Sequence, residues 1–185
     1  MEIDIDDEFY VDKSLLVKVL NTKLNKKDRF ICVSRPRRFG KTMAANMIAA
    51  YYSKDCDSHD VFSDLKISKD SSFEENINKY TVIQLDMNDV VTNKEDNSIT
   101  EYINKEVVSE LRKIYPSALP EENVSLSKAI KEIFSLTGDQ FVFVIDEYDV
   151  IIRDQKYSSE LDGYLTFLVS LFKNSATAPA IALAY

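Results

Sequence analysis

The sequence holds little of what several kinds of functional site require. It has one histidine and two cysteines among 185 residues. A single histidine leaves too few soft ligands for a zinc site, so we interpret the cluster of Cys, His and Asp at residues 56–60 as a surface loop. Two cysteines give no disulfide framework, and Cys32 falls in a predicted core strand. These features predict a protein of the reducing cytoplasm.

Long apolar runs and an excess of positive charge are also missing. No segment resembles a signal peptide or is long and apolar enough to cross a membrane. The net charge is −8, which disfavours binding of duplex DNA over the whole surface. Positive charge is nevertheless dense at residues 23–41. In an acidic chain, such a local basic run suits a small polyanion better than a duplex.

Glycine is scarce as well, and one of the three glycines lies in the tripeptide Gly40-Lys41-Thr42. Before it, the apolar residues 30–33 predict a buried parallel strand, and after it an alanine-rich run predicts a helix. A strand, a polar loop and a helix in this order are the context of a phosphate-binding loop. Backbone N–H groups at a helix start lack intrahelical partners and lie at the positive end of the helix dipole, so they bind phosphate oxygens.

Each residue of the tripeptide has a chemical role in that hypothesis. Gly40 lets the backbone approach the phosphates, Lys41 supplies a cation, and the Thr42 hydroxyl is suited to hold Mg²⁺. The predicted phosphate-binding residues are Arg35, Pro36, Arg37, Arg38, Phe39, Gly40, Lys41 and Thr42. The general motif has glycine at the position of Arg35, where a required positive φ would cost an arginine roughly 1–2 kcal/mol. The alternative interpretation is a basic surface turn before a helix.

A second motif follows about 100 residues later, where the apolar residues 141–145 precede Asp146 and Glu147. They predict a buried strand whose carboxyl end presents two acids, at the sheet edge where ligands bind in open α/β folds. We expect Asp146 to share the Mg²⁺ of Thr42, and Glu147 to act as the catalytic residue that orients or deprotonates a water. The alternative is a solvated acidic turn after a strand.

The remaining pattern predicts alternating helices and strands. We expect a helix at residues 13–20, capped by Asp12, with Leu15, Leu16, Val19 and Leu20 on its apolar face. Further helices are expected at residues 43–52, 99–114, 125–136 and 157–173, strands at 80–87 and 179–185, and irregular polar segments at 53–72 and 88–97. The apolar residues at helical spacing are Ala44, Met47, Ile48 and Tyr51 in the first of these helices, Ile103, Val107, Leu111 and Ile114 in the second, and Leu161, Tyr164, Leu165, Leu168 and Phe172 in the last. We assign residues 1–28 to a leader and short helix packed on the core, and residues 29–185 to one α/β domain.

Four segments carry a resemblance to a known family. They are Phe9-Tyr-Val-Asp-Lys13, Ser34-Arg-Pro-Arg-Arg-Phe-Gly-Lys-Thr42, Ile145-Asp-Glu-Tyr-Asp149 and Ala180-Ile-Ala-Leu-Ala-Tyr185. Together they resemble the predicted AAA-ATPase-like family of bacteria, from residue 9 to the C-terminus. The string from Arg35 to Thr42 is highly specific to that family, whose members also carry arginine at this position.

The resemblance implies a three-layer α/β P-loop NTPase fold of the additional-strand type, with a mostly parallel sheet in the order 5-1-4-3-2. It implies that a fifth strand and a polar sensor residue follow the fourth strand, and many relatives continue into a restriction-endonuclease-like nuclease domain. We therefore expect a chain truncated after the fourth core strand, with an open edge at residues 30–33 that favours self-association. Arg112 and Arg153 are candidates for an arginine acting in trans, with solvated surface charges as the alternative.

The sequence thus predicts an AAA-like ATPase module that binds ATP and Mg²⁺. We expect it to couple nucleotide binding and hydrolysis to a protein partner or a C-terminal effector domain, a nuclease among the candidates. The alternative is a nucleotide-gated scaffold that binds ATP without productive hydrolysis, which Arg35 leaves open. A nucleotide kinase would need an arginine-rich lid over its acceptor, and the sequence shows none. We expect this fragment to bind neither duplex DNA nor a membrane.

Overall fold

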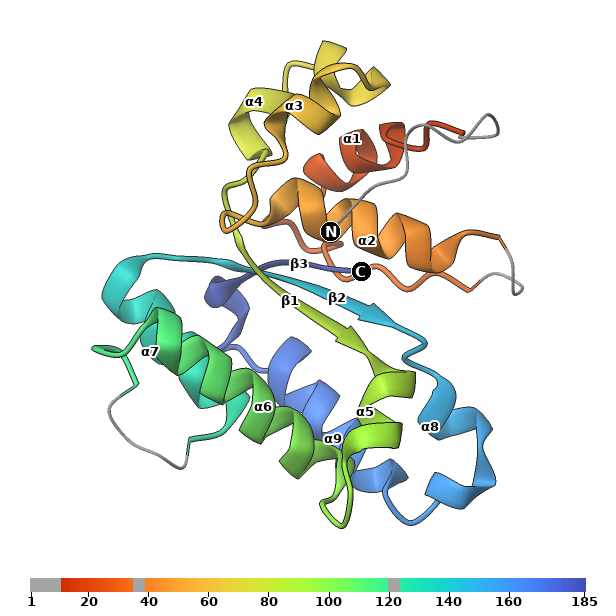
Figure 1. Cartoon of the computed structure of the whole chain (residues 1–185). Helices are drawn as coiled ribbons and strands as arrows, with labels where there is room; N and C mark the ends of the chain where they lie inside the picture. The colour runs from red at the N-terminus through yellow and green to blue at the C-terminus, as the bar shows by residue number, and fades with distance from the viewer. Residues whose placement is uncertain (1–10, 35–38, 120–123) are drawn as a thin grey trace. The chain divides into compact units, whose positions relative to one another are not determined.

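The structure is a computed structural model that describes residues 11–34, 39–119 and 124–185 (Figure 1). It contains a small parallel sheet. In the described residues the sheet has three strands, β1 (Thr81–Asp86), β2 (Phe141–Asp146) and β3 (Ile181–Ala184), in the spatial order β1-β2-β3. Parallel neighbours require crossover connections, and the segments between these strands are helical. The α/β class and all three strands are those that the sequence predicts.

The segment before the predicted phosphate-binding loop pairs with β3, at the edge of this sheet. Phe30 forms a parallel bridge with Ala184, and the Ile31 N–H donates to the Ala184 carbonyl at 2.9 Å. The neighbours along the sheet are therefore those of the implied order. The prediction of a buried strand at residues 30–33 is nevertheless wrong, because only Phe30 pairs as a bridge, its side chain is 37% exposed and Cys32 is exposed. A short apolar run gives the composition of a strand but does not tell how many neighbours cover it.

The described chain divides into two compact units. The first comprises residues 1–84, 142–144 and 182–185, and the second comprises residues 85–141 and 145–181. The first unit contains α1 (Leu15–Asn21), α2 (Lys41–Tyr52), α3 (His59–Ser63), the 3₁₀ helix η1 (Lys66–Lys69) and α4 (Phe73–Asn76). The segment at residues 53–72, expected to be irregular, thus holds α3 and η1, anchored by the buried Phe62 and Ile67.

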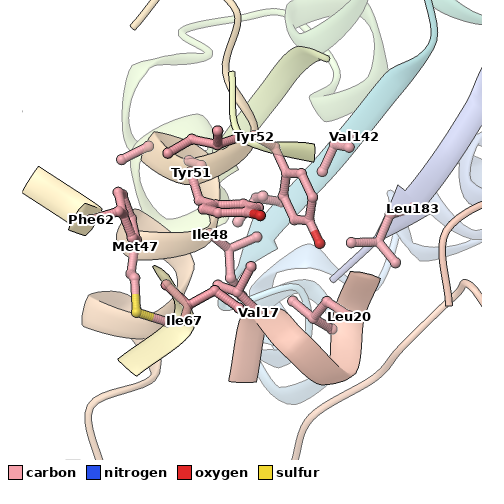
Figure 2. Packing of buried hydrophobic residues seen from close by; sticks show 14 of the residues in the cluster. Val17, Leu20, Met47, Ile48, Tyr51, Tyr52, Phe62, Ile67, Val142 and Leu183 are labelled. Carbon is pink, nitrogen blue, oxygen red and sulfur yellow. The ribbon is translucent and has the colours of Figure 1, made fainter. Parts of the chain in front are cut away.

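The core of the first unit is built around α2 (Figure 2). Its side chains contact those of α1, β2 and β3 in one cluster whose labelled members are Val17, Leu20, Met47, Ile48, Tyr51, Tyr52, Phe62, Ile67, Val142 and Leu183. The helical spacing of apolar residues in α2 predicts this buried face correctly. In α1, Leu20 is buried as predicted, but Leu15 and Val19 are 47% and 53% exposed, and Val17 is buried instead. A helix this short offers two apolar faces, and only packing decides between them.

Two buried tyrosines join α1 to α2 through polar contacts. The Tyr52 hydroxyl donates to Asn21 Oδ1 at 2.7 Å, and Asn21 Nδ2 donates to the Tyr51 hydroxyl at 3.1 Å. Burial raises the pKa of Tyr51 to about 12 and raises the pKa of Tyr52 further. Both hydroxyls therefore stay protonated at physiological pH and fix the relative position of the two helices.

The second unit is mainly helical. It contains α5 (Met87–Asn93), α6 (Ile99–Ile114), α7 (Leu126–Thr137), α8 (Val150–Arg153) and α9 (Leu161–Phe172), with the 3₁₀ helices η2 (Gln155–Tyr157) and η3 (Ala178–Ala180). Helix α6 has the predicted bounds and begins with a capping box between Ser98 and Glu101. No helix in the described ranges combines the length and the apolarity that crossing a membrane requires.

Three predictions for the second unit are wrong. The polar segment at residues 88–97 begins with α5, because the Asp86 carboxylate caps the N–H of Asn88 and the apolar Met87 and Val90 are buried. Ile114 lies in the last turn of α6 and is 48% exposed. Leu165 is 42% exposed in α9, where Phe167 is buried.

The chain just before α1 is held by two side chains. Asp12 accepts hydrogen bonds from the N–H groups of Ser14 at 2.8 Å and of Lys66 at 2.9 Å. The buried Ser14 hydroxyl accepts from the Ile67 N–H at 3.1 Å. Burial raises the pKa of Asp12, but the hydrogen bonds from Ser14 and Lys66 outweigh it and leave the pKa below its usual 3.8. Residues 12–14 are therefore fixed on η1.

We predict that Asp12→Ala lowers the free energy of unfolding at pH 7 by about 1–2 kcal/mol, because two N–H groups lose a charged acceptor. A depressed folded-state pKa stabilises the protein above the unfolded-state value and ceases to do so as the pH falls through the folded-state value. The difference from wild type should therefore shrink below about pH 4 in urea unfolding curves. Asp57→Ala, at an exposed position, is the control; an equal loss there would contradict the prediction.

Candidate functional site

The first group of predicted site residues lies at the start of α2. Gly40 precedes the helix with φ +72° and ψ 34°, a left-handed conformation that glycine adopts without steric cost. Its carbonyl accepts from the Ala44 N–H at 3.0 Å, and no side chain in the described ranges caps the helix. Thr42 is exposed in the first turn, and the Phe39 side chain is 58% exposed. The helix start thus presents backbone N–H groups, Lys41 and a hydroxyl beside the exposed Phe39.

Lys13, which the two sequence motifs do not include, contacts the residue before Gly40. The Lys13 Nζ donates to the Phe39 carbonyl at 3.3 Å, from 26 positions earlier in the chain. The same atom lies 2.7 Å from the position that a Cβ on Gly40 would occupy. Lys13 falls within the first segment of the family resemblance, which is the one signal in the sequence that points to it.

The second group lies where β2 ends. Asp146 is the last residue of β2, and its Oδ1 accepts the backbone N–H of Glu147 at 2.9 Å. Glu147 has φ +50°, which is uncommon for a residue with a side chain. Its carbonyl accepts from the Val150 N–H at 3.0 Å, which closes the turn into α8. Both acids are partly buried, so the structure presents two carboxylates at the carboxyl end of the strand, as predicted.

Arg153 holds the acidic turn together. Its Nη2 lies 2.7 Å from Glu147 Oε2, and its Nε lies 2.9 Å from Asp149 Oδ2. One guanidinium thus bridges two carboxylates with its forked donors. Of the two candidates for an arginine acting in trans, Arg153 is engaged within its own chain, and Arg112 Nε donates to the Leu119 carbonyl at 3.2 Å.

A buried tyrosine fixes the same turn from α9. The Tyr164 hydroxyl donates to the Tyr148 carbonyl at 3.1 Å. Burial, with a smaller contribution from the charge of Asp149, raises the pKa of Tyr164, so the hydroxyl remains a donor. The backbone between the two acids and α8 is therefore held by hydrogen bonds at Glu147 and Tyr148.

The structure brings the predicted residues together in two groups. Phe39, Gly40, Lys41 and Thr42 form the first group, in the first unit, and Asp146 and Glu147 form the second group, in the second unit. A Mg²⁺ ion shared by Thr42 and Asp146 stays a prediction. The other predicted phosphate ligands, Arg35, Pro36, Arg37 and Arg38, lie outside the described residues.

The chemistry of the described residues fits a magnesium nucleotide. Within the described ranges, no group of three or more His, Cys, Asp or Glu side chains is arranged to hold a metal ion. Mg²⁺ is usually bound by one or two protein oxygens together with phosphate oxygens and waters, so a hydroxyl and a carboxylate suffice for it. The uncapped helix start and its lysine suit the phosphates that such an ion accompanies.

Comparison with protein families gives one match over nearly the whole chain. The family model described as "Predicted AAA-ATPase" matches residues 1–181. No curated protein and no solved structure matches the chain.

The conformation of Gly40 leads to a stability prediction. Gly40→Ala should lower the free energy of unfolding by about 1–2 kcal/mol, because a Cβ is disfavoured at φ +72°. The Lys13 ammonium can swing away, so the cost should equal that of Gly138→Ala, where φ is +78° and the space is open. Gly163→Ala, within α9, should instead raise the stability by about 0.5–1 kcal/mol. Thermal unfolding of the three variants measures the order of their stabilities. A Gly40→Ala variant as stable as wild type would contradict the left-handed conformation before α2.

Proposed function

The chain belongs to the family described as predicted AAA-ATPase, and we propose that it binds ATP with Mg²⁺ and hydrolyses it. One observation carries this proposal. The left-handed Gly40 leads directly into the uncapped start of α2, with Lys41 and Thr42 in its first turn. That combination of backbone and side chains is typical of phosphate-binding loops. The same loop contains Arg35, Pro36, Arg37, Arg38 and Phe39 in the sequence, and we include them among the phosphate-binding residues.

Each residue has a distinct role in this proposal. The N–H groups of the first turn and the Lys41 ammonium bind phosphate oxygens, and Thr42 and Asp146 hold Mg²⁺. When bound, Mg²⁺ neutralises charge on the phosphates. Glu147 orients and deprotonates the attacking water, which its place directly after β2 supports. Its left-handed backbone adds support, since strained residues concentrate at functional sites.

The ion pair of Glu147 favours a second candidate function. The Arg153 guanidinium lies 2.7 Å from Glu147 Oε2, where it competes with a water for the carboxylate. In this arrangement the chain would bind ATP without productive turnover, as a nucleotide-gated scaffold. The two functions differ in whether Arg153 releases Glu147 when nucleotide binds. In either case we propose that the bound state is transmitted to a protein partner or an effector domain.

We predict that Lys41→Ala weakens ATP binding by about 100-fold, because charge-assisted hydrogen bonds to the phosphates are lost. Lys128→Ala is the matched control, since Lys128 lies in α7 of the second unit and pairs with Glu132. Isothermal titration calorimetry with ATP and Mg²⁺ measures both affinities. Equal affinities would refute the phosphate-loop assignment. Repeating the titration with GTP determines the base preference.

We also predict that Glu147→Gln keeps the ATP affinity within about threefold and lowers the hydrolysis rate on the order of 100-fold, because the base is lost and the shape is retained. Asp146→Asn should instead weaken the binding that depends on Mg²⁺. Phosphate release and calorimetry separate these two effects. If Glu147→Gln hydrolyses ATP at the wild-type rate, the water is activated elsewhere. If wild type binds ATP and does not turn it over, the scaffold is the correct function.

A further inference from the structure

We propose that Lys13 is a second cationic ligand of the nucleotide phosphates, beside Lys41. The inference rests on the proposed function, because it assigns a further residue to the same phosphate site. It is carried by three observations on the first unit: how the backbone of Lys13 is held, where its ammonium lies, and what that ammonium contacts.

The backbone on both sides of Lys13 is fixed. Asp12 accepts the Ser14 and Lys66 N–H groups at 2.8 and 2.9 Å, and the Ser14 hydroxyl accepts the Ile67 N–H at 3.1 Å. Ser14 has no exposed surface, and α1 follows directly with Val17 and Leu20 in the core (Figure 2). A lysine between two such anchors loses less conformational freedom on binding a ligand than one on a free loop.

The ammonium of Lys13 lies beside Gly40, the residue that directly precedes α2. It is 3.3 Å from the Phe39 carbonyl and 2.7 Å from the position of an added Cβ on Gly40. Gly40 therefore has a second role besides its positive φ, since its missing side chain leaves room for the ammonium. The cation is placed where the first N–H groups of α2 begin, so it adds to the positive potential of the helix start.

Among the described residues, the contact that Lys13 makes leaves its charge uncompensated. Its hydrogen-bond acceptor is a neutral carbonyl, and within the described ranges no carboxylate lies at ion-pair distance from it. Other lysines nearby differ, since Lys18 pairs with Asp70 at 2.8 Å and Lys23 pairs with Asp28. A phosphate oxygen is a stronger acceptor than a carbonyl, so the exposed ammonium would move to it with a small rotation of a flexible side chain.

The competing explanation is that Lys13 only braces the loop through the Phe39 carbonyl. The two roles differ in their dependence on charge. A brace requires a hydrogen-bond donor, whereas a phosphate ligand requires a cation whose attraction is screened by salt.

The test is the ATP affinity of wild type and of the variants Lys13→Gln, Lys13→Arg, Lys18→Gln and Lys41→Ala, measured by calorimetry at low and high salt. We expect Lys13→Gln to weaken binding by about 10-fold or more and to reduce its salt dependence, because a charged contact is lost. Lys13→Arg should stay within about threefold of wild type, because the charge is kept. Lys18→Gln removes the same charge from the neighbouring helix and should have little effect.

Each outcome decides one of the two proposals. If wild type and Lys41→Ala show that ATP binds at the loop, and Lys13→Gln binds like wild type, the role of Lys13 is refuted and the proposed function stands. A weaker Lys13→Gln with an unchanged salt dependence, or a Lys13→Arg variant as weak as Lys13→Gln, also refutes the role, since both indicate a brace. If wild type binds no ATP, the proposed function fails, and the role of Lys13 fails with it. Urea unfolding without nucleotide verifies that each variant is folded.

Discussion

Eight of the twelve residues of α2 are buried, so the helix that follows Gly40 cannot shift without opening the core around it. Met47 and Ile48 belong to the same buried cluster as residues of α1 and η1, and the hydroxyls of Tyr51 and Tyr52 are held by Asn21. The position of the first turn is thus determined by packing along the rest of the helix. A phosphate site on such an element would be preorganised by the packing of the helix.

The acidic turn after β2 is held in a different way, by electrostatics and backbone hydrogen bonds. Glu147 keeps a left-handed backbone because the Asp146 carboxylate accepts its N–H and the Val150 N–H donates to its carbonyl. Arg153 adds contacts to Glu147 and Asp149. A single guanidinium therefore orients two carboxylates of the turn through its side-chain contacts.

The sequence predicts those parts of the fold that local signals determine. Helix α6 has its capping box between Ser98 and Glu101 and a regular apolar spacing, so its bounds are predicted correctly. The prediction of a buried strand at residues 30–33 is wrong because the exposure of this segment depends on neighbours that only the folded chain supplies. The prediction of an irregular segment at α5 is wrong because the segment is polar in composition, although Asp86 caps a helix there. For the candidate site, spacing identifies the two motifs, whereas the contact of Lys13 with Phe39 arises from packing 26 positions apart and leaves no local pattern.

The backbone of Glu147 also bears on how this protein can change in evolution. A left-handed conformation disfavours any residue with a side chain, and asparagine tolerates it better than glutamate does. Random mutation under selection for thermal stability alone should therefore favour asparagine or glycine at this position. A glutamate retained there in spite of the strain would indicate selection for something other than stability, because stability alone disfavours it.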